Sequence, residues 1–467
     1  MPSNSWWSSG RWPVSSVLTS NTTDMQIVPR AGISSAPSGA ISHSVAGGQR
    51  SQLTCAVDAG EARKRRTGAG EVAPLGIDAK YKHTALKIDP DTGEILGGFD
   101  PSTAVIQRFI LQSVARKLLP ESRTNNCLRV RAKHKPVWSR EVVDQTIKVW
   151  KSKEHKKAFF SGLQTCGSVW QCPVCASKIA ERRRAEIIAV MAAHKAARGC
   201  VNMLTLTCPH QRSDELKLLL AKQAKALNSF WKDRQTKAVF VEMGVVGQIR
   251  ALEVTHGRKS AHNNGWHPHY HVLLFAGVGV DLARFDAVNM KDWQVRLYLR
   301  WANACKLAGL GEPSFAHGLK LDDGSKAAKY VSKWGLEDEM TKGHTKKGKA
   351  GGETPFDLLR ALVVDRNDKQ AAALFIEFAK TFKGKRQLHW SSGLKKRYAI
   401  DEKTDEEIAE EKDDSAVILG AITIDQWRDI LADDGRGVVL NLGSSQDWQA
   451  IADYIQSIKG KFRPKPV

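Results

Sequence analysis

The sequence has no long apolar run, few cysteines and too few acidic residues to balance its basic ones. No window approaches the roughly 18 apolar residues that a membrane-spanning helix needs. The opening residues MPSNSWWSSGRWPVSS lack the charged start and apolar stretch of a signal peptide. Eight cysteines in 467 residues are too scattered for a secreted disulfide scaffold. These absences predict a soluble protein of the reducing cytoplasm.

The shortage of acidic residues leaves a strongly basic chain. Lysine and arginine number 71 against 49 aspartates and glutamates, a formal net charge of +22. The segment from Ala115 to Cys200 has 19 basic and 6 acidic residues, so more than half of the net charge lies there. Ordinary surfaces mix both signs, so this segment predicts a docking face for nucleic acid. A solvated helical surface, or attraction to an anionic membrane, is the alternative.

The length of the chain predicts two or more folded units joined by linkers. Composition and spacing divide it into a disordered arm rich in Ser, Gly, Thr and Ala (1–75), the basic segment (115–200), a central domain (201–335), a helical extension (336–400), an acidic linker (401–414) and a small C-terminal unit (415–467).

The central domain alternates short strands with amphipathic helices, which predicts the α+β class. The expected elements are strands at 201–207, 247–255 and 269–275, a helix at 213–231 with Ser213 as its N-cap, a helix after Asp281 through Ala308, and a helix carrying SKAAKYVSKWG. The polar loop HGRKSAHNNGW separates the second and third strands, as expected for antiparallel neighbours.

The stretch NGWHPHYHVLLF places His267, His269 and His271 two residues apart. Side chains two apart in a strand share one face, so these imidazoles can hold a divalent metal. Glu253 of the preceding strand is the candidate carboxylate ligand. A surface cluster without function, or a hydrogen-bonded core histidine, is the alternative. His267 is the weakest of the three candidates because Pro268 interrupts strand pairing just after it.

In SKAAKYVSKW, Tyr330 and Lys333 lie three apart and share a helix face. A phenol is a poor nucleophile until a cation or metal favours its phenolate form, and Lys333 can supply that charge. By itself, such a pair usually indicates only an ordinary surface helix. Its significance here comes from the histidine strand upstream.

Cys172 and Cys175 have zinc-knuckle spacing, and Cys166 is a third candidate ligand. Cys127 in the same basic segment is the candidate fourth ligand, with His155 as the alternative. A redox pair is a second alternative for the CxxC motif. The basic residues that follow the motif, Lys178, Arg182, Arg183 and Arg184, are candidate contacts to DNA phosphates.

The stretches VNMLTLTCPH, HPHYHVLLF and KYVSKW, in this order, resemble the three motifs of the HUH endonucleases, specifically the rolling-circle replication initiators of bacterial plasmids. TCGSVWQCPVCASKIAERRR upstream and TPFDLL at 354–359 resemble the same branch. The resemblance covers roughly residues 120–400. It implies an HUH-type central antiparallel sheet flanked by helices and preceded by a zinc-binding helical segment, and it favours Cys127 as the fourth zinc ligand.

The resemblance also implies a mechanism. Magnesium or manganese at His269 and His271 polarises one phosphate of single-stranded origin DNA, and Tyr330 attacks it. The products are a 5′-phosphotyrosine link, later religated, and a free 3′-OH that primes replication, with a host helicase and polymerase as implied partners. Some initiators carry a glutamate four residues before the tyrosine, where this chain has Lys326.

Two other functions remain open from the sequence. A conjugative relaxase or single-strand transposase would use the same chemistry on a transfer origin or on element ends. A zinc-stabilised DNA-binding regulator would bind DNA without cutting it.

Overall fold

The computed structural model describes residues 104–132, 146–261, 263–276, 287–323, 352–411 and 413–462. All of them belong to the unit that runs from Thr84 to Val467. The expected N-terminal arm and the residues Tyr330, Lys333 and Lys326 lie outside the described residues. Within the described ranges, no helix is both long and apolar enough to cross a bilayer.

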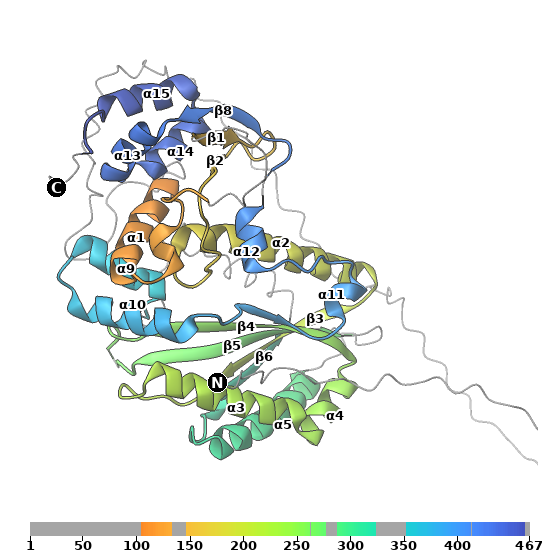
Figure 1. Cartoon of the computed structure of the whole chain (residues 1–467). Helices are drawn as coiled ribbons and strands as arrows, with labels where there is room; N and C mark the ends of the chain where they lie inside the picture. The colour runs from red at the N-terminus through yellow and green to blue at the C-terminus, as the bar shows by residue number, and fades with distance from the viewer. Residues whose placement is uncertain are drawn as a thin grey trace, which may run out of the picture. The chain divides into compact units, whose positions relative to one another are not determined.

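A five-stranded antiparallel sheet forms the centre of the fold, with its strands in the order β6-β3-β5-β4-β7 (Figure 1). Its strands are β3 (Cys200–Thr207), β4 (Val245–His256), β5 (Trp266–Ala276), β6 (Leu319–Asp323) and β7 (Leu388–Trp390). The expected α+β class is confirmed, and β4 and β5 are antiparallel neighbours as the loop between them predicts. The edge strand β7 comes from a segment that the sequence predicts to be helical.

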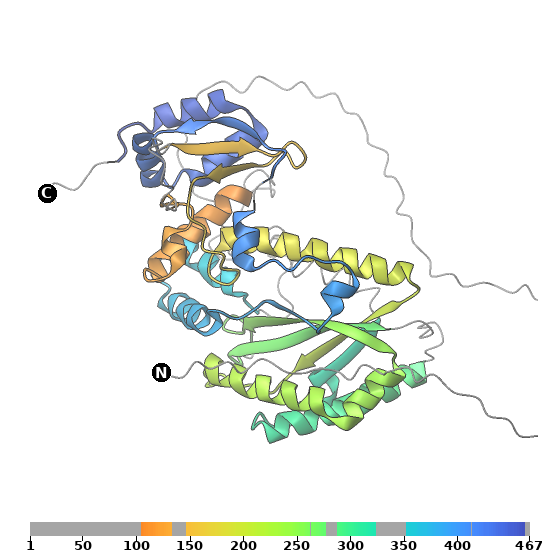
Figure 2. The ribbon, with the colours of Figure 1, turned by 45° about the vertical axis from the view of Figure 1, so that its right-hand side comes forward.

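Helices flank both faces of this sheet (Figure 2). Their bounds are α1 (Ala104–Leu118), η2 (Arg123–Asn126, a 3-10 helix), α2 (Pro173–Ala196), α3 (Leu216–Lys232), α4 (Arg234–Glu242), α5 (Ala287–Leu307), α6 (Phe315–Gly318), α9 (Pro355–Val364), α10 (Lys369–Phe382), α11 (Leu394–Arg397), α12 (Asp405–Glu410), α13 (Ile424–Ala432), α14 (Arg436–Ser445) and α15 (Trp448–Ser457).

The strands send alternate side chains to the two faces of the central sheet. Leu204 and Leu274 are buried in the core cluster that contains the apolar faces of α3 and α5. Met203 and Leu273, one residue away in each strand, pack instead with Ile187 of α2. Figures 1 and 2 show α3 and α5 on one side of the sheet and α2 on the other. Each fully buried aliphatic side chain stabilises the fold by about 1.5–3 kcal/mol.

The first turn of α3 differs from the sequence prediction. The predicted N-cap, Ser213, is wrong: the helix begins at Leu216, and its N-cap Glu215 makes no side-chain capping bond. The backbone N–H of Leu216 donates instead to Oε1 of Glu377, in α10, at 2.9 Å. A carboxylate from a distant helix therefore satisfies a donor that a local cap would otherwise take.

The C-terminal segment shares a second sheet with residues far upstream. This sheet has the order β2-β1-β8, with β1 (Ile147–Lys151), β2 (Ala158–Ser161) and β8 (Val417–Ile422). Ile147 and Val149 are fully buried in one core with Ile422 and Ile451. The expected C-terminal unit therefore does not build its sheet and core from its own residues alone, because β8 pairs with β1 of the basic segment.

The acidic stretch that the sequence predicts to be a linker contains the short helix α12, which packs against α2. Thr404 and Glu407 form a capping box at its start, and Ile408 is fully buried. The side chain of Arg183 in α2 donates to Asp405 Oδ1 at 3.0 Å. Acidic and basic segments more than 200 residues apart in sequence therefore lie side by side.

Candidate functional site

The three histidines lie in one row on β5, and the register of the sheet determines which residues of β3 and β4 lie beside them. His269 pairs with Glu253 on β4 and with Thr207 on β3. Paired residues and residues two apart share a face. Glu253, His269 and His271 therefore project from the face against which α2 packs.

Glu253, His269 and His271 form a close cluster, hereafter the histidine cluster. Nε2 of His269 and Nε2 of His271 each lie 3.1 Å from Oε2 of Glu253. The Nδ1 atoms have other partners: Thr205 Oγ1 lies 3.2 Å from that of His271, and the His267 carbonyl lies 3.4 Å from that of His269. These outer contacts orient both Nε2 atoms toward Glu253, as second partners orient histidines at metal sites.

Glu253 is ionised at neutral pH. Burial opposes its ionisation, but hydrogen bonds from His269 and His271 hold the pKa of this carboxyl well below its usual range. Its side chain remains 35% exposed. Two imidazoles and an accessible carboxylate are a donor set that suits a divalent cation.

At the start of β5 the structure contradicts one expectation, the interruption at Pro268, and agrees with another, that His267 is the weakest candidate ligand. Pro268 does not interrupt the strand, because β5 continues through it with Pro268 opposite Val254. His267 does not join the close cluster. Its Nδ1 lies instead 2.6 Å from Nε2 of His210, a residue that the sequence reasoning did not select. The signal for His210 was its place in TCPH, directly after β3.

A cavity of about 740 Å³ adjoins the histidine cluster. Thr207, Thr255 and His267 line it from the sheet, and loop residues that include His210 and Lys259 form other walls. Since Thr207 and Thr255 pair with His269 and His267 respectively, the cavity continues the face that carries the cluster. A substrate bound at the cluster therefore has room beside it.

The loop that forms one wall of this cavity is fixed by an ion-pair network. Arg258, whose side chain is 6% exposed, pairs with Glu353 and with Asp368 Oδ2, the latter at 2.7 Å. The His256 N–H also donates to the Glu353 carbonyl at 2.8 Å. Buried and bidentate contacts of this kind hold a loop far better than exposed ion pairs do.

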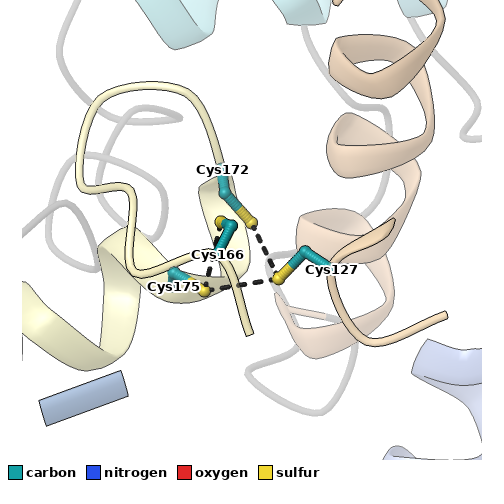
Figure 3. Close-up of side chains that lie close together, drawn as sticks. All are labelled: Cys127, Cys166, Cys172 and Cys175. Atoms are coloured by element: carbon teal, nitrogen blue, oxygen red, sulfur yellow. Dashed lines mark hydrogen bonds between the residues drawn. The ribbon is translucent and has the colours of Figure 1, made fainter. Parts of the chain in front are cut away.

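The structure brings together the four cysteines that the sequence selects, hereafter the cysteine cluster (Figure 3). Cys172 is the N-cap residue of α2, Cys175 lies in its first turn, Cys166 precedes it, and Cys127 follows η2. Three of the sulfur pairs, Cys127–Cys175, Cys166–Cys175 and Cys127–Cys172, are 3.4, 3.6 and 3.8 Å apart. Four thiolates around a tetrahedral zinc ion at 2.3 Å would be about 3.8 Å apart, so the arrangement fits this ion.

Hydrogen bonds favour a single thiolate, that of Cys172, in the cysteine cluster. Gln112 Nε2 donates to Cys172 Sγ at 3.1 Å. Burial opposes ionisation of Cys172, but hydrogen bonds with the other three thiols hold its pKa well below the usual value. The same contacts raise the pKa of Cys127, so without a cation the cluster resists a second negative charge. His155, the alternative ligand, is exposed and lies 3.9 Å from Glu154.

The four basic residues behind the CxxC motif divide into two pairs. Lys178 donates to the Ala409 carbonyl at 3.0 Å, and Arg183, 14% exposed, pairs with Asp405 and Glu186. Both therefore hold α12 against α2. Arg182 and Arg184 are 40% and 33% exposed, with looser contacts of 3.8 Å to Glu186 and 3.4 Å to Glu181 respectively. These two remain accessible to an anionic ligand.

Residues 158–304 match the family described as "Replication protein". "Protein rep" of Streptomyces lividans is 25% identical over 301 residues, which cover 51% of this chain and 65% of that protein. "Neomycin resistance protein" of Streptomyces cyanogenus is 29% identical over 149 residues, 27% of this chain and 33% of that protein. The chain thus spans less than two thirds of either relative. No solved structure matches it.

Proposed function

We propose, from the match to the family described as "Replication protein" and the similarity to "Protein rep", that this chain binds a plasmid origin, nicks one DNA strand and religates it. The observation that carries the proposal is the histidine cluster, which has three metal-type ligands on one sheet face beside a cavity. The "Replication protein" match at residues 158–304 includes every member of this cluster.

His269, His271 and Glu253 would hold the divalent cation. Bound there, magnesium or manganese would supply positive charge to a phosphate that gains negative charge during displacement. The chain's own contribution is orientation, because Thr205 fixes the ring of His271 and the His267 carbonyl fixes the ring of His269. The adjoining cavity would accept the nucleotides that flank the scissile phosphate.

Tyr330 is the proposed nucleophile. Its phenolic oxygen forms a bond to phosphorus as the bond to the 3′ oxygen breaks, which leaves a 5′-phosphotyrosine and a free 3′-OH. The phenol gives up its proton and the leaving oxygen takes one up, and the positive charge of Lys333 favours the phenolate. No ATP is consumed, because the covalent link conserves the phosphodiester energy for religation.

Chain length allows Tyr330 to reach the histidine cluster. β6 ends at Asp323, opposite Asn202, while Thr207 lies beside His269 at the other end of β3. These two positions on β3 are five residues apart, roughly 17 Å along a strand. Tyr330 is seven positions after Asp323, and seven residue steps can span up to roughly 23 Å.

Zinc is the proposed occupant of the cysteine cluster, with a structural role in the basic segment. A closed set of four buried thiol ligands leaves no open coordination position for a substrate. We assign DNA docking to the basic segment 115–200 and nicking to residues 201–335, with 336–400 as an extension. Within the basic segment, Arg182 and Arg184 are the proposed phosphate contacts because of their exposure.

The test is mass spectrometry of the tryptic peptide that contains Tyr330, after incubation with single-stranded origin DNA and magnesium or manganese. We expect a DNA adduct on Tyr330, no adduct in Tyr330→Phe, and a normal yield in the control Tyr398→Phe. Origin binding by Tyr330→Phe should match the wild type. Adducts that persist in Tyr330→Phe contradict the proposal, and binding without any cleavage would indicate the DNA-binding regulator.

A transfer origin and transposon ends serve as further substrates in the same assay. Preferential cleavage of a plasmid origin supports a replication initiator, which the relative named "Protein rep" favours. Preferential cleavage of either other DNA would indicate the relaxase or the transposase.

A further inference from the structure

We propose that the guanidinium of Arg436 is the counter-charge of a zinc tetrathiolate at the cysteine cluster, so that metal binding and docking of the C-terminal segment 417–458 are coupled. This inference rests on the zinc occupancy proposed above. It does not depend on DNA nicking. It concerns a residue outside the family match and 309 positions from Cys127 in sequence.

Arg436 is fully buried and is linked to the cluster by hydrogen bonds. One of its terminal nitrogens donates to Gln112 Oε1 at 2.6 Å, to the Cys127 carbonyl at 3.3 Å and to the Leu128 carbonyl at 3.2 Å. Gln112 in turn donates to Cys172 Sγ at 3.1 Å. The arginine therefore contacts one cysteine through its backbone and a second through a single intervening amide.

The charges around Arg436 do not balance without the cluster. Arg129 lies beside it, and both guanidiniums share Asp434, at 3.6 Å from Arg129 and 3.9 Å from Arg436. Among the salt bridges of the described residues, this carboxylate is the partner of both, and it is 44% exposed. An incompletely paired buried cation is costly. A zinc ion with four thiolates carries two net negative charges and would offset the surplus.

Arg436 also opens α14, so its position fixes how the C-terminal segment meets the cluster. The next residue, Gly437, lies so close to α1 that an added Cβ would be 2.7 Å from the Cα of Ile106. Such close backbone approach leaves little room for α14 to shift. Arg436 is the first residue of α14 and is bonded to the cluster. If the cysteines lose their negative charge, Arg436 loses its counter-charge, and the contact between α14 and α1 should loosen.

The test is a zinc affinity, measured on the full chain by competition with a chromophoric chelator, with cobalt absorption to identify tetrathiolate coordination. We expect Arg436→Met to weaken zinc binding by about 10–100-fold, the range typical of groups that support metal ligands. Arg436→Lys keeps the charge and should recover most of the affinity. The control Arg428→Met removes a 53% exposed arginine of the same segment and should match the wild type.

Asp434→Asn gives an effect of the opposite sign without removing a buried group. Since Asp434 competes with the thiolates for the two arginines, its loss should make zinc binding tighter. Wild-type affinity in Arg436→Met, equal losses in the Lys and Met variants, or unchanged or weaker binding in Asp434→Asn would each overturn the inference. If Arg436→Met does not fold, Asp434→Asn and Arg436→Lys still decide. A wild-type chain that binds no zinc refutes the zinc proposal itself.

Discussion

The two ligand clusters of this chain differ in ligand number, burial and surroundings. The cysteine cluster has four ligands, each 4% exposed or less, and is enclosed by α1, α2 and the start of α14. The histidine cluster has three, and the side chain of Glu253 is 35% exposed beside a cavity. Closed four-ligand sites hold structure, whereas sites with an open position carry out reactions. The contrast agrees with the proposed roles, in which the cysteine cluster stabilises the fold and the histidine cluster carries out the chemistry.

The largest expected effect is the loss of DNA adduct formation when a ligand of the histidine cluster is removed. His271→Ala should reduce DNA adduct formation by more than about 100-fold, because a lost metal ligand costs more than the 10–100-fold typical of its supporting groups. Its melting temperature should change little, and exposed His155→Ala is the control. Adduct yield and thermal unfolding are measured together. A His271→Ala variant that still forms DNA adducts would contradict the catalytic role proposed for the histidine cluster.

The next largest expected effect is a loss of folding stability when a ligand of the cysteine cluster is removed. Cys172→Ser should lower the free energy of unfolding by roughly 3 kcal/mol or more, because loss of a structural metal is among the most destabilising changes. Manganese binding at the histidine cluster should persist while the fold survives. Denaturant unfolding with zinc quantification measures this, with half-buried Cys200→Ser as the control. A wild-type chain fully folded without metal would contradict it.

A smaller effect should distinguish two arginines of α2, one exposed and one paired with acidic residues. Arg184→Ala should lower the salt dependence of DNA binding by about one unit of slope, as the loss of one phosphate contact does. Arg183→Ala should instead lower the free energy of unfolding by about 1–2 kcal/mol, because it leaves Asp405 and Glu186 without that partner. Binding titrations at several salt concentrations and chemical denaturation separate the two. A reversed pattern would show that Arg183 is the residue that contacts DNA.

The smallest effect is a pH dependence of the metal-free histidine cluster. The pKa of Glu253 is lowered in the fold by hydrogen bonds from His269 and His271 that outweigh burial, whereas an unfolded glutamate titrates near pH ~4.3. Its stabilising contribution is therefore present above that value and is lost as pH falls through the folded pKa. Melting temperature between pH 3 and 6 should fall less steeply in Glu253→Gln than in the wild type. Identical slopes would contradict this assignment.

Local spacing predicted the members of each cluster that lie close together in sequence, whereas Cys127 was preferred to His155 from its place in the basic segment and the family resemblance. His269 and His271 share a face since a strand repeats every two residues, and Cys172 and Cys175 meet since they open one helix. Glu253 was predictable as a carboxylate on the neighbouring strand of a hairpin. His210 was missed because it follows β3 in a loop, where no period indicates direction. Ser213 was wrongly predicted as a cap because Glu377 supplies the contact from α10.

The sequence by itself determined the basic charge, the α+β class and the ligands that lie close together along the chain, since composition and period are properties of neighbouring residues. Only the tertiary structure decided the surroundings of those ligands. It paired β8 with β1, placed the acidic α12 on Lys178 and Arg183, and buried Arg436 beside Cys127. Contacts across 200 or more residues leave no local pattern, because they depend on which surfaces meet when the whole chain buries its apolar side chains.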